Sequence, residues 1–91
     1  VVDAQEHPNA DKLLKLSVDI GEDKPRPIIA GIAQDYSPKE LINSQVVILA
    51  NLEPKMIRGE LSYGMLLAVD SDDGVALLKP EKEIPNGSKV R

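Results

Sequence analysis

Alternating apolar and polar residues predict the first clear strand. Between residues 14 and 20, leucine, valine and isoleucine alternate with polar residues, the period-two pattern of a half-buried strand. Gly21 ends this run, and a charged stretch with two prolines leads to a second apolar run at residues 28–32. We expect the two runs to form a hairpin.

A short helix is predicted after this hairpin. The segment Ser37-Pro38-Lys39-Glu40 has capping-box spacing, with proline at the first helical position and glutamate three residues after the capping serine. Asn43 and Ser44 limit the helix to one or two turns.

Three further strands are predicted beyond the helix. Residues 46–49 are β-branched or apolar throughout, which favours a central strand covered on both faces. Residues 65–69 resume an apolar strand, and Asp73-Gly74 supplies a hairpin turn into residues 75–78.

These elements predict an all-β domain. Short, closely spaced strands without crossover helices favour a closed five-stranded Greek-key barrel of the OB type. With a strand before residue 7 counted as the first, the one short helix lies between the third and fourth strands. A chain of 91 residues is expected to form one domain, residues 1–91. Because Val1 opens directly on a β-branched pair, we expect the chain to be a fragment of a longer protein.

Composition restricts the chemistry. Without cysteine there is no thiolate nucleophile or cysteine-ligated zinc, and a reducing compartment fits. No apolar stretch approaches the length of a membrane span, so the domain is expected to be soluble and cytoplasmic, with no membrane partner. The net charge of -4 implies that any site for a polyanion is local, because phosphate neutralisation needs clustered lysine and arginine.

No catalytic or metal-binding motif is found. His7 lacks a second nitrogen or sulfur ligand, and residues 7–11 have the composition of a turn between strands. The acidic stretch at residues 70–74 lacks calcium-loop spacing and its closing glutamate. We therefore expect no catalytic residue, no metal and no cofactor, and a non-catalytic accessory domain.

The segment at residues 51–59 is the best candidate for binding. It separates two strands and combines a polar asparagine with two cations, proline and glycine. By composition alone, an exposed loop and a binding loop are about equally favoured. OB barrels bind oligonucleotides beside such loops, which makes Lys12, Lys55 and Arg58 candidate phosphate contacts. With two tyrosines as the only aromatics, a structured RNA suits the chain better than an unstructured strand.

Several short motifs, in order and with fitting separations, resemble the tRNA-binding domain family over essentially the whole chain. They are His7-Pro8-Asn9-Ala10-Asp11-Lys12-Leu13, Ala30-Gly31-Ile32, Tyr36-Ser37-Pro38-Lys39-Glu40-Leu41, Asn51-Leu52-Glu53-Pro54, Arg58-Gly59 and Ser62-Tyr63-Gly64-Met65-Leu66.

The branch found at the C-terminus of methionyl-tRNA synthetases is the most similar. The resemblance implies an OB core, a homodimer, and tRNA affinity that reads shape more than sequence. It also implies an appendage or β subunit that raises the tRNA concentration near a synthetase catalytic domain, in cis or in trans.

Carried over by residue, the resemblance implies that Asn51, Arg58, Ser62 and Met65 face the tRNA, with Lys12 and Arg26 adding phosphate contacts. Met65 equally fits the core, because it begins an apolar strand. The alternative for Ser62 is that it only shapes the turn before Gly64, and the alternative for Asn51 is that its side chain caps the loop.

The sequence departs from the family pattern in three places. Met56 stands where a basic residue is common, so Lys55 is expected to substitute from another direction. Tyr63 stands between Ser62 and Gly64, where glutamine or glutamate is usual. The family's first strand usually begins further upstream, so the resemblance implies that this chain starts inside that strand at Val1. The alternative function is a protein-interaction, dimerisation or chaperone-like module without tRNA binding.

Overall fold

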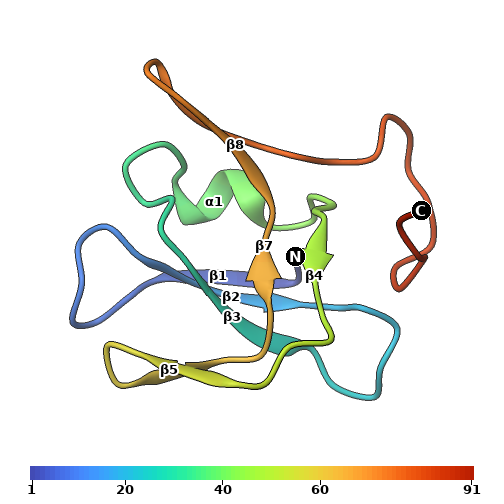
Figure 1. The fold of residues 1–91 in the computed structure, drawn as a ribbon, viewed down its shortest axis with the longest axis horizontal. Coiled ribbons are helices and arrows are strands. Elements are labelled where there is room, and N and C mark those ends of the chain that lie inside the picture. Colours follow the sequence, from blue (N-terminus) through green and yellow to red (C-terminus); the bar gives the residue numbers. More distant parts are fainter.

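The computed structural model describes residues 1–91 and is built from short strands with one helix of a single turn (Figure 1). The elements are β1 (Asp3–Glu6), β2 (Leu14–Val18), β3 (Arg26–Ala30), α1 (Pro38–Leu41), β4 (Ile48–Leu49), β5 (Lys55–Ile57), β6 (Glu60–Ser62), β7 (Met65–Leu66), β8 (Ala68–Ser71) and β9 (Gly74–Leu77). The predicted all-β class is confirmed, and α1 lies between β3 and β4 as expected. No helix has the length and apolar content needed to span a membrane.

The antiparallel sheet β1-β2-β3 supplies most of the core. Leu16 is fully buried and lies opposite both Ala4 of β1 and Ile28 of β3. The predicted hairpin is therefore confirmed, and the residues that alternate in β2 face the interior as the period-two pattern requires. The buried hydrophobic cluster comprises Ala4, Leu14, Leu16, Val18, Ile28, Ala30, Ile32 and Leu41.

Helix α1 begins where the capping motif predicts. The backbone N–H of Ser37 donates to Glu40 Oε1 at 2.7 Å, and Leu41 packs into the core. Asn43, with φ of 69°, adopts the left-handed conformation that commonly ends a helix.

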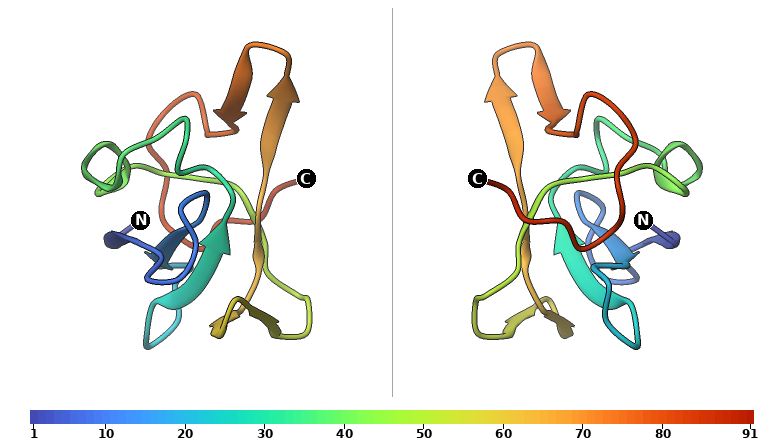
Figure 2. Two further views of the ribbon diagram at one scale, coloured as in Figure 1. Left: turned by 90° about the vertical axis from the view of Figure 1, so that its left-hand side faces the viewer. Right: turned by 90° about the vertical axis from the view of Figure 1, so that its right-hand side faces the viewer.

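The other strands pair in twos, as β4-β7, β5-β6 and β8-β9. No closed barrel of five strands is detected, and β4 is not the predicted central strand because β7 is its single neighbour. Leu49 of β4 is 41% exposed. The apolar run was misleading because apolar residues on both faces of a strand do not reveal how many strands pair with it. Residues 51–59, predicted as a loop between two strands, contribute instead to the β5-β6 hairpin. This hairpin and β8-β9 lie at opposite ends of the molecule (Figures 1 and 2).

A seam of two hydrogen bonds joins the outer edge of β3 to the end of β6. The N–H of Tyr63 donates to the carbonyl of Pro27, and the N–H of Ile29 donates to Ser62 Oγ, both at 2.9 Å. At Gly64 the chain then crosses close to β4, because a Cβ there would lie 3.0 Å from the Leu49 carbonyl oxygen. The seam fixes where the β5-β6 hairpin leaves the core.

Beyond β9 the chain forms an exposed C-terminal arm, residues 79–91, without helix or strand. The side-chain amide of Gln45 holds the arm by donating to the carbonyl of Ile84 and accepting from its N–H. Gly87, with φ of 89°, lies against the backbone of Ile20, where any Cβ would collide.

Candidate nucleic-acid interface

The β5-β6 hairpin presents Arg58 at its tip. A two-residue turn joins the strands, and Arg58 and Gly59 have φ of 51° and 86°. Two consecutive positive φ values are typical of a type I′ turn, the connection that matches the twist of a tight hairpin. The backbone therefore projects the Arg58 side chain, which is exposed, from a defined turn.

Contacts with the sheet hold the tip and middle of the hairpin. His7 is 5% exposed; its Nδ1 accepts from the N–H of Asn9 at 3.0 Å, so the ring proton is on Nε2, which lies 3.4 Å from the carbonyl oxygen of Ile57. Lys15 Nζ forms an ion pair with Glu60 at 3.2 Å. The connection between β1 and β2 is the predicted turn, and its histidine supports the hairpin.

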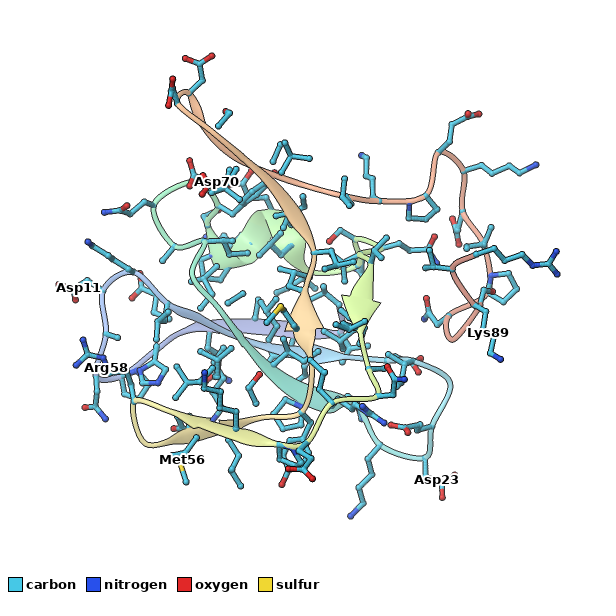
Figure 3. All side chains as sticks on the ribbon, viewed as in Figure 1. Asp11, Asp23, Met56, Arg58, Asp70 and Lys89 are labelled. Carbon is cyan, nitrogen blue, oxygen red and sulfur yellow. The ribbon has the colours of Figure 1, made fainter.

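Three cations in this region are exposed and unpaired. Lys12 lies in the same connection as His7, Lys55 begins β5, and Arg58 occupies the tip. None of them forms an ion pair or a side-chain hydrogen bond, whereas Lys15 and Arg26 are both paired. Figure 3 shows Arg58 at the same end of the molecule as Asp11, the neighbour of Lys12 in sequence. The side chains of these three predicted residues are therefore accessible to solvent.

Arg26 has a different environment from the other predicted cations. Its Nε and Nη2 donate to the two carboxylate oxygens of Glu22 at 2.8 and 2.9 Å. Its Nη1 donates to the carbonyl oxygens of Ala50 and Tyr63 at 2.5 and 3.0 Å. The hydrogen bond from Arg26 lowers the pKa of the Glu22 carboxyl below its ordinary value. A phosphate would have to displace these contacts to reach the guanidinium.

The predicted polar and apolar contacts also differ in exposure. Ser62 is 3% exposed and uses its hydroxyl internally, accepting from Ile29 and donating to the carbonyl of Gly64 at 3.0 Å. Asn51 is exposed directly after Ala50, and Met65 of β7 is 54% exposed, so Met65 does not belong to the core. Ser62 therefore shapes the backbone from within, while Asn51 and Met65 are accessible.

Met56 and Lys55 are neighbours in β5 with opposed side chains, because successive residues of a strand point to opposite faces. Met56 is 60% exposed and pairs across the hairpin with Leu61, which is also exposed. The Lys55 side chain thus points in a different direction from a side chain at position 56. Tyr63 is half-buried.

Sequence reasoning missed Glu22 and the supporting role of His7. The spacing of Glu22 and Arg26, four residues apart, is the one local signal for their ion pair, although the segment between them is a loop rather than a helix. The contact between His7 and Ile57 joins residues 50 positions apart and leaves no pattern in the sequence.

Sequence comparisons relate this chain to a known family and to larger proteins. The sequence model described as a "tRNA binding domain" matches residues 1–89. The methionine–tRNA ligase of Pyrococcus furiosus is 54% identical over 91 residues, which is 100% of this chain and 12% of that protein. The methionine–tRNA ligase of Methanothrix thermoacetophila is 53% identical over 91 residues, which is 100% of this chain and 13% of that protein. The chain thus spans about an eighth of the length of these relatives.

Two solved structures share the fold. The methionyl-tRNA synthetase related protein of Pyrococcus horikoshii has a TM-score of 0.89 and 37% identity, covering 100% of this chain and 84% of that chain. The chaperone CsaA of Bacillus anthracis has a TM-score of 0.85 and 34% identity, covering 99% of this chain and 83% of that chain.

Proposed function

This chain belongs to the tRNA-binding domain family, and from that premise we propose that it binds tRNA through its β5-β6 hairpin and the adjoining β1-β2 connection. The observation that carries the proposal is the set of exposed, unpaired cations Lys12, Lys55 and Arg58 in a chain of net charge -4. In such a chain, cations left without a carboxylate partner provide a local site for a polyanion.

Binding of this kind relies on phosphate contacts and shape. Three cations neutralise few phosphates, and one half-buried tyrosine near the hairpin offers little surface for base stacking. Asn51 and Met65 are accessible beside the hairpin and supply a polar and an apolar contact. We expect recognition of folded tRNA to be weak, general and largely independent of sequence.

We place this domain as an appendage of a methionyl-tRNA synthetase or as a separate subunit acting with one. A tethered module of weak affinity raises the local tRNA concentration near the catalytic domain without contributing to the chemistry. OB-type topology, homodimerisation and a cytoplasmic location belong to the same proposal. The likeness to methionyl-tRNA synthetase sequences and to a related solved structure supports it.

The test is a fluorescence titration of total tRNA at several salt concentrations, with duplex DNA for comparison. Arg58→Asn is the informative variant, because asparagine tolerates the left-handed conformation of the turn and removes the cation. Lys39→Gln is the matched control: it removes one cation from α1, which lies away from β5 in Figures 1 and 2.

With three phosphate contacts, the logarithm of the binding constant should fall with the logarithm of the salt concentration at a slope of roughly −2 to −3. Arg58→Asn should weaken binding and reduce this slope by about 0.7–0.9, whereas Lys39→Gln should change neither. Absence of tRNA binding by the unaltered chain, or an affinity independent of salt, would rule out the proposal.

A chaperone-like or protein-interaction module is the second candidate. It is supported by the likeness to CsaA and by exposed apolar residues such as Leu49 and Met65, which lie opposite each other on β4 and β7. This function predicts that the chain suppresses aggregation of a denatured test protein, that Arg58→Asn leaves this unchanged, and that tRNA binding is undetectable.

A further inference from the structure

A single guanidinium joins both ends of the segment that carries the β5-β6 hairpin. Arg26 Nη1 contacts the carbonyl of Ala50, where the chain leaves β4, and that of Tyr63, where it returns toward β7. These two carbonyls belong to residues that directly flank the segment 51–62, in which Asn51, Lys55 and Arg58 lie.

We propose that Glu22 and Arg26 form a positioning clamp that orients this hairpin for binding, and that Arg26 itself does not contact phosphate. The inference rests on the proposed tRNA-binding function. It assigns a role to Glu22, an acidic residue whose carboxylate would otherwise only repel a polyanion.

The hydrogen-bonding capacity of Arg26 supports the clamp. Four contacts are made by a side chain with five N–H donors, so little capacity is left for a ligand. The carboxylate of Glu22 fixes the guanidinium plane by pairing with two of its nitrogens, which is a geometry that lysine does not reproduce.

A small change of angle at the base of the hairpin causes a large displacement of its tip. From Ala50 to Ile57 the chain extends by up to about 23 Å at roughly 3.3 Å per residue. A tilt of about 10° at the base would therefore move the tip by about 4 Å, more than the length of a hydrogen bond. Beyond the base, the hairpin is held by the single 3.4 Å contact of the His7 ring with Ile57 and by the partly exposed ion pair between Lys15 and Glu60.

Replacement of Glu22 distinguishes a clamp from a phosphate contact by the sign of the effect. If Arg26 bound phosphate, Glu22→Gln would free the guanidinium and remove a negative charge, and tRNA binding would tighten with a steeper salt slope. If Arg26 is a clamp, the same change loosens the hairpin and weakens binding. Asp23→Asn is the matched control, because Asp23 is exposed, carries the same charge in the same loop, and forms no ion pair or side-chain hydrogen bond.

We expect Glu22→Gln to bind tRNA at least about threefold more weakly than Asp23→Asn. Arg26→Lys should also weaken binding while keeping the salt slope of the unaltered chain, because no phosphate contact is lost. Folding is checked by circular dichroism, and the amide ¹⁵N shifts of Asn51 and Gly64 report directly on the preceding carbonyls that Arg26 contacts. Those shifts should move in Glu22→Gln and stay in place in Asp23→Asn.

The inference is overturned if Glu22→Gln binds as tightly as Asp23→Asn or more tightly. It is also overturned if Arg26→Lys lowers the salt slope by about 0.7–0.9, the signature of a lost phosphate contact. Failure of the proposed function is a separate result, since the unaltered chain would then not bind tRNA at all.

Discussion

Replacing Ser62 with alanine should destabilise the fold, although the sequence suggested a tRNA contact for this residue. The hydroxyl accepts from the N–H of Ile29 and donates to the carbonyl of Gly64, and both Ser62 and Ile29 are buried. Alanine keeps the size of the side chain and removes both hydrogen bonds. The Ile29 N–H then faces β6 with no acceptor.

The magnitude follows from burial. A buried donor left without a partner costs about 1–3 kcal/mol, while the half-buried carbonyl of Gly64 loses less because water can replace the hydroxyl. We therefore expect the free energy of unfolding to fall by about 2–3 kcal/mol. For a domain of this size, that corresponds to a Tm lower by roughly 8–24 °C.

The assay is urea denaturation of Ser62→Ala beside Ser71→Ala. Ser71 is a close match because its hydroxyl donates to the carbonyl of Gly74 and accepts from the N–H of Asp73, but at an exposed turn. Water can replace that hydroxyl, so Ser71→Ala should change stability by no more than about 0.5 kcal/mol. Equal effects of the two substitutions would refute the reasoning, as would a loss of tRNA affinity in Ser62→Ala with unchanged stability.

Three further substitutions give distinct outcomes. Met56→Lys should tighten tRNA binding and steepen the salt slope by about 0.7–0.9, because it adds a cation on the exposed outer face of β5; an unchanged slope would contradict this. Arg26 lowers the pKa of Glu22, so the stability that this pair supplies is present above the ordinary carboxyl pKa of 4.5 and is lost as the pH falls. Below pH 4.5, the urea midpoint of Glu22→Gln should therefore vary less with pH than the midpoint of the unaltered chain. Gly87→Ala should release the C-terminal arm from Ile20 and speed its cleavage in limited proteolysis, while the urea midpoint of the remaining domain changes little.

Local signals predicted much of the fold. The alternation in residues 14–18 predicted a strand correctly because one face of β2 is buried. The capping box at Ser37 predicted the helix start correctly because its hydrogen bonds lie within a single turn and depend on no distant residue. The run at residues 46–49 misled because apolar residues on both faces do not reveal how many strands lie alongside.

The candidate site was predicted less completely, for a physical reason. Exposed cations such as Arg58 could be named from sequence because exposure follows from neighbouring polar residues. The internal roles of Arg26 and Ser62 could not, since their partners lie 24, 37 and 33 positions away along the chain. The sequence alone does not distinguish an arginine that binds phosphate from one that donates hydrogen bonds to backbone carbonyls.

The left-handed backbone of Arg58 has a consequence for evolution and engineering. Side chains with a Cβ lose roughly 1–2 kcal/mol in this conformation, and glycine or asparagine would relieve much of the strain. Selection for thermal stability alone would therefore tend to discard this arginine. Redesigns that select for a higher melting temperature should therefore keep Arg58. Otherwise they will raise thermal stability and lower the tRNA affinity that we propose for the domain.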